Sequence, residues 1–444
     1  MTYQQALLYL NSFINYEKIA DYSYQDSLRL DRVRDFLRLL GSPEKGLKII
    51  HVAGSKGKGS VCAFCAYILR EAGFSVGLYT SPHLSDLRER IRVLRPHPAE
   101  KKDAFEGLIP RPALARLTKT LQRAVKVYQR SKAAGRLSFF EVFTALAFLY
   151  FKEKRVDFVV LETGLGGRLD ATNAASSLVC VITPISLEHT QKLGKTVAAI
   201  ATEKAGIIKE KRSIVLAASQ DKKARQVFRD KCLKAGARLY EAGRDIKYNG
   251  CRRAFSVSTP WGRCDHLRIR LLGRHQLANA ALAVGAVKAL SCFGFQAGPT
   301  ALRKGLQAAS WPARCEVFRR NPLVVLDGAQ NLASAKALKE AVRDNFKFRK
   351  LILVIGVSSD KDIRGICKQL KPLAREVILT ASHNPRAMDP VELSGYFRGA
   401  GKSPVLHITG SVKEAKALAL RAAAKDDLIL VTGSLFVAGE FRDA

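Results

Sequence analysis

The chain has 444 residues, 47% of them hydrophobic and 25% charged, the balance of a globular protein with two or three domains. It carries 74 Lys and Arg against 39 Asp and Glu, a formal charge of +35, which attracts anions in general. The basic residues are spread along the whole chain without a basic arm or zinc finger, so a dedicated nucleic-acid-binding protein is disfavoured.

No targeting or membrane segment is recognisable in the sequence. The first 25 residues lack a basic start followed by an apolar run, and the longest apolar stretch, residues 142–151, is too short to span a bilayer. We therefore expect a cytoplasmic protein with no membrane partner. Cys62 and Cys65 form a C-x-x-C in an apolar helical stretch without a second pair, which indicates buried thiols rather than a metal or redox site.

Helical and strand patterns alternate through the first 200 residues. Near-continuous apolar strands of this kind are typical of parallel sheets covered on both faces. The rhythm predicts an α/β domain with a mostly parallel sheet. The predicted helices cover residues 28–40, 60–72 and 139–151, and the predicted strands cover 47–53, 75–79, 156–162 and 178–183.

The later part of the chain predicts an insertion and a second domain. Residues 251–272 alternate and contain a turn at 259–262, which predicts a small hairpin before a helix over 275–292. A boundary at 294–299 would divide a domain of residues 1–296 from a smaller α/β, Rossmann-like domain of residues 297–444. Its predicted strands cover residues 323–326, 350–356, 376–380, 405–408 and 427–431.

The most informative segment is a glycine-rich turn between a predicted strand and a predicted helix. Its residues are Gly54, Ser55, Lys56, Gly57, Lys58, Gly59 and Ser60. Backbone N–H groups in such a turn, with the helix N-terminus, form an anion cradle, and glycines let phosphate oxygens approach. Lys58 can bring positive charge to the β- and γ-phosphates, and Ser60 can cap the helix or help bind the nucleotide. The usual Walker pattern does not fit, because Val52 and Gly59 stand at two of its required positions.

A carboxylate stands at the end of a second buried strand. Glu162 precedes the glycine-rich residues 163–173, at the end of a parallel strand where such sheets bind ligands. Mg²⁺ prefers hard oxygen ligands and shares them with phosphates. The position therefore predicts a Mg²⁺ ligand, with a structural acid in a salt bridge as the alternative.

These motifs together resemble a known family. HVAGSKGKGS at 51–60, TSPHL at 80–84, ERI at 89–91 and ETGLGGRLDATN at 162–173 resemble folylpolyglutamate synthase and dihydrofolate synthase, of the Mur ligase superfamily. The resemblance runs from about residue 28 to 438. It implies an ATP-binding Mur ligase-like domain over 1–296 and a glutamate ligase domain over 297–444.

The resemblance also implies a metal site with a modified lysine. It makes Glu162 a Mg²⁺ ligand together with Ser81 and His189, where His189 alone would be read as structural. Lys204, in EKAGI at 203–207, is typically carbamylated in the family and would then bind a second Mg²⁺. An unmodified Lys204 paired with a nearby acid is the alternative.

Further matched residues imply a nucleotide clamp. Asn279 would contact the adenine edge, Arg314 the γ-phosphate and Asp327 the ribose hydroxyls. Gln330 stands where the family has His, so it can form hydrogen bonds but cannot carry charge, and Lys56 stands where the family has Asn. The expected catalytic residues are thus Lys58, His189, Lys204 and Arg314, and the expected nucleotide-binding residues are Gly54, Ser55, Gly57, Lys58, Gly59, Ser60, Asn279, Arg314, Asp327 and Gln330.

The function that the resemblance implies is an ATP- and Mg²⁺-dependent ligase, bifunctional and monomeric. It would add L-glutamate to dihydropteroate, to folate polyglutamates or to both, through an acyl phosphate, with ATP bound between the domains. Phe139, Phe140 and Glu141 would lie near the pteridine pocket, with a place in the core as the alternative for Phe139 and Phe140. Two alternatives are a Mur ligase acting on peptidoglycan precursors and a basic nucleic-acid-binding ATPase.

Overall fold

The computed structural model describes residues 1–19, 21–96, 105–130, 135–398 and 404–444. Their contacts divide the chain into two compact units, and each is described by itself. The first unit holds Met1–His83, Arg88–Arg270 and Gln276–Ala309, and the second holds Leu84–Leu87, Leu271–His275 and Ser310–Ala444.

The first unit is built on a seven-stranded sheet of order β3-β2-β4-β1-β5-β6-β7. All neighbouring strands are parallel except β2 and β3, which are antiparallel. The four central strands are buried along their whole length, which matches their continuous apolar sequences. The strands are β1 (Ile49–Ala53), β2 (Val76–Tyr79), β3 (Ile91–Leu94), β4 (Phe158–Glu162), β5 (Val179–Ile182), β6 (Ile214–Ala217) and β7 (Arg238–Glu241).

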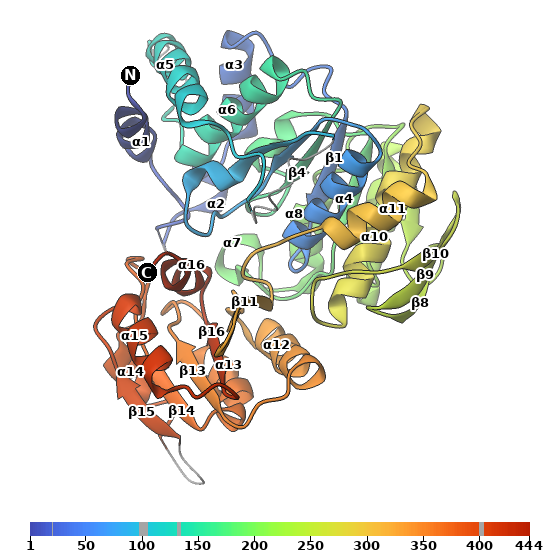
Figure 1. The fold of residues 1–444 in the computed structure, drawn as a ribbon. Helices are drawn as coiled ribbons and strands as arrows, with labels where there is room; N and C mark the ends of the chain where they lie inside the picture. The colour runs from blue at the N-terminus through green and yellow to red at the C-terminus, as the bar shows by residue number, and fades with distance from the viewer. Residues whose placement is uncertain (20, 97–104, 131–134, 399–403) are drawn as a thin grey trace. The chain divides into compact units, whose positions relative to one another are not determined.

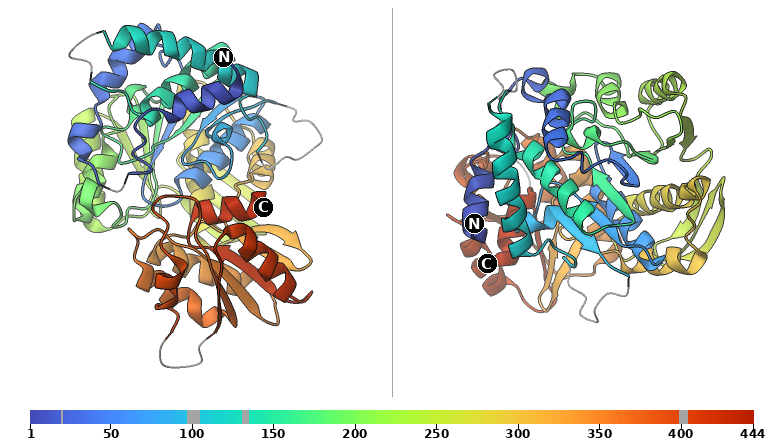
Figure 2. Two further views of the ribbon diagram at one scale, coloured as in Figure 1. Left: turned by 90° about the vertical axis from the view of Figure 1, so that its left-hand side faces the viewer. Right: turned by 90° about the horizontal axis from the view of Figure 1, so that it is seen from above.

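Helices cover both faces of this sheet (Figures 1 and 2). Leu216 of β6 meets Gly285 of α10 on one face, whereas Val215 and Ala217 pack with α8 and α9 on the other. The helices are α1 (Tyr3–Asn11), α2 (Tyr24–Ser27), α3 (Leu30–Leu39), α4 (Lys58–Glu71), α5 (Arg111–Tyr128), α6 (Phe139–Glu153), α7 (Thr190–Leu193), α8 (Val197–Ala205), α9 (Lys222–Ala235), α10 (His275–Ala289) and α11 (Pro299–Ala308), with short 3-10 turns η1 (Leu87–Arg90), η2 (Ala171–Ala174) and η3 (Leu290–Phe293).

A small antiparallel sheet follows β7. Its strands are β8 (Lys247–Cys251), β9 (Ala254–Thr259) and β10 (Gly262–Leu267), in the order β10-β9-β8. The predicted hairpin is therefore the β9–β10 pair, turning between Thr259 and Gly262 as expected. A third strand, β8, pairs with β9; it begins four residues before the predicted segment and ends at that segment's first residue.

Among the described residues, one helical segment is apolar and long enough to cross a membrane by length and composition, His275–Phe293. It is longer than the apolar stretch singled out from the sequence. Because 67% of its apolar window is buried inside the protein, the helix packs as an apolar core helix does.

The second unit is a six-stranded sheet of order β11-β12-β16-β13-β14-β15. Only the β11–β12 pair is antiparallel among its described strands. The strands are β11 (Glu316–Arg320), β12 (Leu323–Leu326), β13 (Leu351–Ile355), β14 (Glu376–Leu379), β15 (Val405–Ile408) and β16 (Leu428–Thr432), and the helices are α12 (Leu332–Asn345), α13 (Ile363–Leu370), α14 (Pro390–Ser394), α15 (Val412–Ala422) and α16 (Leu435–Asp443), with the 3-10 turn η4 (Lys371–Leu373).

The predicted fold class is confirmed, because both units are α/β with largely parallel sheets. The predicted division of the functional domains at residues 296 and 297 stays a prediction. In the structure α11, which follows that point, belongs to the first unit and packs against α4, where Gly305 lies directly on Ile68.

Candidate active site

The glycine-rich turn joins β1 to α4 and is closely packed. Gly54 has φ +146°, and a Cβ there would lie 1.8 Å from Oγ1 of Thr183. Gly57 has φ +87°, and a Cβ there would lie 2.5 Å from Oδ1 of Asn279. Both positions require glycine for space as well as for backbone conformation. The loop is therefore held closely against its neighbours, and its role as a phosphate cradle stays a prediction.

The serines of the turn have structural partners. The Ser55 hydroxyl donates to the carbonyl of Ser186 at 3.1 Å and accepts from its N–H at 3.0 Å, so it ties the loop to the segment after β5. The predicted capping role of Ser60 is wrong, because α4 begins two residues earlier and Gly57 occupies the N-cap position. Ser60 is buried in the first turn of the helix. Contacts of Ser55, Gly59 and Ser60 with a nucleotide stay predictions.

Three lysines lie in or beside the loop, and two of them share one carboxylate. Nζ of Lys58 and of Lys204 both donate to the carbonyl of Gly54, at 3.2 and 2.8 Å. Lys204 also pairs with Glu188 at 3.1 Å, and Lys56 pairs with the other oxygen of Glu188 at 3.0 Å. The loop, the segment before α7 and α8 are thus joined through charged side chains.

This shared carboxylate changes the pKa values of the cluster. Burial opposes ionisation of Glu188, but neighbouring lysines, chiefly Lys204, outweigh it and lower the pKa of Glu188 to about 2. Burial lowers the pKa of Lys204 to about 8, although Glu188 partly offsets the effect. A lysine with that pKa is partly an uncharged amine near neutral pH, the form that reacts with CO₂. The carbamylation of Lys204 stays a prediction, and the pairing with an acid is what this unmodified chain forms.

Glu162 stands at the end of β4, the strand beside β1, in register with Val52. It is 6% exposed, and its Oε2 accepts from the backbone N–H of Ser81 at 3.2 Å. The structure thus brings two of the predicted metal ligands together beside the phosphate loop. His189 lies at the N-cap position of α7 with φ +48°, in the segment that also carries Glu188.

The residues present fit a Mg²⁺ ion of the kind that is shared with phosphates. A buried carboxylate and a serine offer hard oxygen atoms, and Mg²⁺ usually keeps waters and substrate oxygens as its other ligands. Within the described ranges, no three His, Cys, Asp or Glu side chains gather as a ready metal cluster. The metal roles of His189 and Lys204 therefore stay predictions.

The loop after Glu162 is organised by Asp170, a residue that the sequence analysis did not single out. Its Oδ2 accepts from the N–H groups of Gly164 and Leu165, both at 2.9 Å. Its Oδ1 accepts from the N–H and the hydroxyl of Thr172, at 3.0 and 2.5 Å. Burial raises the pKa of Asp170, although these hydrogen bonds oppose the shift. The position of Asp170 inside the GLGGRLDATN motif was the available signal.

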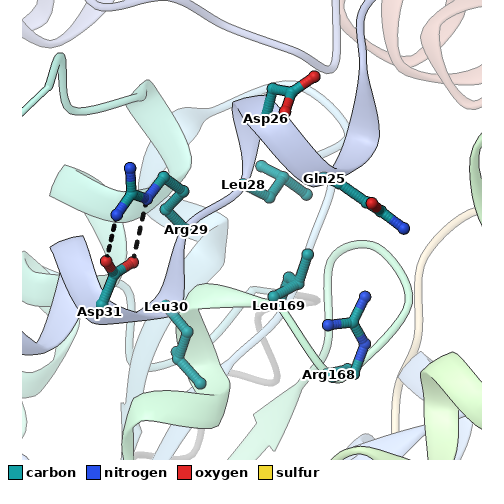
Figure 3. Close-up of a pocket in the computed structure, with 8 residues that line it drawn as sticks. All are labelled: Gln25, Asp26, Leu28, Arg29, Leu30, Asp31, Arg168 and Leu169. Carbon is teal, nitrogen blue, oxygen red and sulfur yellow. Dashed lines mark hydrogen bonds and ion pairs between the residues drawn. The ribbon is translucent and has the colours of Figure 1, made fainter.

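A cavity of about 610 Å³ opens beside this loop (Figure 3). Arg168 and Leu169 of the loop line it on one side, and α2 with the start of α3 lines it on the other. Arg168 pairs with Glu203 at 2.9 Å, and Tyr24 donates to the same carboxylate at 3.0 Å. The remaining lining residues are Gln25, Asp26, Leu28, Arg29, Leu30 and Asp31.

Among the residues expected near a pteridine pocket, Phe139 and Glu141 have buried partners. Phe139 is 1% exposed and stacks on Phe143 in the core. Glu141 forms a buried ion pair with Arg32 at 2.6 Å and closes the capping box of α6 with Ser138. The core alternative holds for Phe139, and the expected position of Phe140 and Glu141 near a pteridine pocket stays a prediction.

Asn279 lies on α10 against the phosphate loop. It is 4% exposed, and its Nδ2 donates to Oε1 of Gln276 at 2.9 Å. Its Oδ1 faces Gly57. The structure therefore places Asn279 beside the loop, and its contact with adenine stays a prediction.

In the second unit, Arg314 and Asp327 lie at the same end of the antiparallel β11–β12 pair, just before β11 and just after β12. Arg314 donates to the carbonyl of Ala313 at 2.9 Å, and Asp327 accepts from the N–H groups of Cys315 and Ala329 at 2.7 and 2.8 Å. Burial raises the pKa of Asp327 to about 6, although Arg314 opposes the shift. Gln330 is exposed, and its N–H donates to the Ser334 hydroxyl at 3.1 Å. The nucleotide roles of Arg314, Asp327 and Gln330 stay predictions.

Family models match both parts of the chain. The Mur ligase middle domain matches residues 114–287, and the Mur ligase glutamate ligase domain matches residues 313–435. The chain is 34% identical over 429 residues to the dihydrofolate synthase/folylpolyglutamate synthase of Bacillus subtilis (strain 168), covering 93% of this chain and 94% of that protein.

Solved structures of similar proteins support the same family relationship. Mycobacterium tuberculosis folylpolyglutamate synthase complexed with ADP and AMPPCP is similar with a TM-score of 0.85 at 30% identity, over 99% of this chain and 98% of that one. E. coli FolC in complex with DHPP and ADP is similar with a TM-score of 0.85 at 29% identity, over 100% and 97%. The chain belongs to the dihydrofolate synthase/folylpolyglutamate synthase family of Mur ligases.

Proposed function

We propose that this chain is an ATP- and Mg²⁺-dependent ligase that adds L-glutamate to dihydropteroate, to folate polyglutamates or to both. The observation that carries the proposal is the packed glycine loop between β1 and α4, ringed by Lys56, Lys58 and Lys204, with Glu162 at the end of the adjacent strand. This combination of a phosphate cradle and a metal-binding carboxylate suits a nucleoside triphosphate.

The residues of the first unit would divide the work. The N–H groups of the loop and the Lys58 ammonium would bind the β- and γ-phosphates. Glu162 and Ser81, with His189 and the carbamylated Lys204, would hold two Mg²⁺ ions. Bound Mg²⁺ neutralises phosphate charge and so supports attack on the γ-phosphorus.

The chemistry proceeds in two displacements. A substrate carboxylate oxygen attacks the γ-phosphorus of ATP, the bond to the bridging oxygen breaks, and ADP leaves with formation of an acyl phosphate. The glutamate amine then attacks the acyl carbon, loses a proton and expels inorganic phosphate, leaving an amide. Positioning and charge neutralisation supply most of the catalysis in such transfers.

The cavity beside Asp170 is our candidate for the folate-side substrate. Its volume of about 610 Å³ lies in the range of small-molecule sites. Arg29 and Arg168 line it, but each is paired with an acid, Asp31 and Glu203, so an anionic substrate would compete with these acids for the guanidinium groups. Relatives support this substrate class, because E. coli FolC has been solved with DHPP and ADP, and an FPGS has been solved with AMPPCP and folate.

Residues of the second unit complete the proposal. Arg314 would bind the γ-phosphate, Asp327 the ribose hydroxyls, and Gln330 would contribute a hydrogen bond without charge. We further propose that the protein is a cytoplasmic monomer with small-molecule partners. Neither nucleic acid nor membrane has a role in the reaction.

Product analysis tests the proposal. Purified protein with ATP, Mg²⁺ and L-glutamate is given dihydropteroate or tetrahydrofolate, and products are followed by mass spectrometry. Gain of one or more glutamyl residues by either acceptor supports the assignment, and gain by both makes the enzyme bifunctional. Glutamate addition only to a peptidoglycan precursor would instead favour the other Mur ligase branch.

A further inference from the structure

The position of Lys56 suggests a use that its family motif does not assign. Its side chain is 32% exposed, whereas Lys204 in the same cluster is 2% exposed. Both pair with Glu188, one on each carboxylate oxygen. Because water competes with a partly exposed ion pair, the Lys56 contact is the weaker of the two.

The two lysines also differ in what holds them. Lys204 donates to the carbonyl of Gly54 as well as to Glu188, so it is fixed by the loop backbone. Lys56 lies within the loop itself, two residues before Lys58, and its backbone N–H donates to the carbonyl of Pro184 at 3.3 Å. A rotation of the Lys56 side chain about its four-carbon stem can thus redirect the ammonium while the loop stays in place.

Binding of a triphosphate changes the competition for this ammonium. A triphosphate brings several negative charges to the mouth of the cradle, whereas Glu188 offers one charge, which it shares with Lys204 as long as that lysine is not carbamylated. Glu188 also repels phosphates, since a carboxylate disfavours an anion nearby. The resting ion pair therefore screens the cradle when no nucleotide is present.

We propose that Lys56 is a second phosphate-binding lysine, held by Glu188 in the empty site and transferred to the nucleotide when ATP binds. The inference rests on the proposed ATP site. In this proposal, Glu188 is the counterion of Lys56 in the empty site, and Lys56 leaves it when ATP binds. The side chain that departs from the family loop thus strengthens nucleotide binding rather than disturbing it.

This arrangement predicts effects of opposite sign at the two ends of one ion pair. Removal of the Lys56 charge in Lys56→Met should weaken Mg²⁺–AMPPCP binding about tenfold, the value of a charge-assisted hydrogen bond. Glu188→Gln should tighten binding about threefold, because it releases Lys56 and removes a repelling charge. A purely structural pair would give losses of similar size in both variants.

Calorimetric titration of the full-length protein with AMPPCP and with adenosine tests the proposal. Lys56→Met should lose affinity for AMPPCP but not for adenosine, Lys56→Arg should stay near wild type, and the gain from Glu188→Gln should vanish in the double variant. Lys247→Met, which removes an exposed lysine on β8, controls for net charge. Thermal melts identify variants that fail to fold. If Glu188→Gln does not fold, the comparison of Lys56→Met with Lys56→Arg still tests the proposal.

The outcomes separate this inference from the proposed function. If wild type binds AMPPCP, Lys58→Met abolishes binding and Lys56→Met leaves it unchanged or tighter, Lys56 has no role in phosphate binding and the inference is overturned. Equal weakening by Lys56→Met and Glu188→Gln overturns it as well. If wild type does not bind AMPPCP, the proposed ATP site itself fails.

Discussion

At the residue scale, the site depends on a few positions where the gain or loss of a single atom would change the shape of a loop. Gly57 is the clearest, since its φ of +87° and the nearby Asn279 exclude a side chain for two separate reasons. Asp170 is a second, because one carboxylate accepts four hydrogen bonds and so shapes the loop after Glu162.

Replacement of Gly57 by Ala should impair nucleotide binding beyond the cost of backbone strain. The strain of a left-handed residue is roughly 1–2 kcal/mol, and the added Cβ also displaces the buried Asn279 from the loop. We expect at least a tenfold rise in the Kd for AMPPCP. Gly41→Ala is the matched control, because Gly41 has φ +76° and a Cβ there would have no other atom within 4 Å. Equal nucleotide affinity in the two variants would contradict the packing argument.

Replacement of Asp170 by Asn should destabilise the protein. An amide has one accepting oxygen and turns its NH₂ toward N–H donors, so at least one buried donor loses its partner, at a cost of about 1–3 kcal/mol. Urea unfolding measures the change. Asp221→Asn is the control, because Asp221 caps α9 by accepting from Lys223, a role that Asn fills equally well. A stability loss no larger than that of the control would argue against the role of Asp170.

At the element scale, much of the architecture could be predicted from periodicity. The strands at 323–326 and 405–408 match the structure at both ends, and the predicted helix at 139–151 begins correctly and ends two residues too early. These elements are recognisable because apolar runs of that length bounded by polar residues have one main reading.

Features built from distant residues could not be predicted in the same way. Lys56 and Glu188 are 132 positions apart, and their pairing depends on β1 lying beside β5. The cavity combines the four-residue helix α2 with the loop at 168–169, and so short a helix has no periodic pattern. Lys58, Glu162 and Ser81 could be singled out from the sequence because their positions at strand ends and in motifs are local signals, and their roles stay predictions.

Strand β1 carries a buried histidine that makes stability depend on pH. His51 is fully buried with Nε2 at 2.8 Å from the Thr172 hydroxyl, and burial lowers its pKa to about 3. The unfolded chain takes up this proton near pH 6.5 while the folded protein does not, so stability falls as the pH falls below 6.5.

Between pH 7 and pH 5, wild type should therefore lose roughly 2 kcal/mol more unfolding free energy than His51→Gln, in which this titration is absent. Urea unfolding of both proteins at the two pH values gives the difference, and other titrating groups cancel in the comparison. Parallel pH dependence of the two proteins would show that His51 is protonated within the fold.

The packing of α11 on α4 leads to a second prediction at the element scale. A Cβ on Gly305 would lie 2.4 Å from the Cα of Ile68, so the two helices would have to separate. Gly305→Ala should destabilise the protein by about 1–3 kcal/mol despite the better helix propensity of Ala. Lys304→Ala, an exposed position on the same helix, should be close to neutral. A stabilised Gly305→Ala in thermal melts would show that α11 is loosely packed.

At the scale of the whole molecule, the family relationship indicates small anionic substrates, whereas a formal charge of +35 by itself would also suit nucleic acid. The distribution of the basic residues bears on this difference. The family match covers both functional domains, whereas the basic residues are spread along the chain. Attraction of ATP and of a polyglutamate tail is one use of such a surface, because an excess of positive charge raises the encounter rate with anions.

The most direct test is glutamate-dependent release of phosphate from ATP by the metal-replete protein, with dihydropteroate in one reaction and tetrahydrofolate in another. We predict release that requires both glutamate and one of the two acceptors, since the acyl phosphate forms on the acceptor and is consumed by the amine. Release with neither acceptor, from protein that binds AMPPCP, would contradict the account, and release stimulated instead by RNA would favour the nucleic-acid-dependent ATPase.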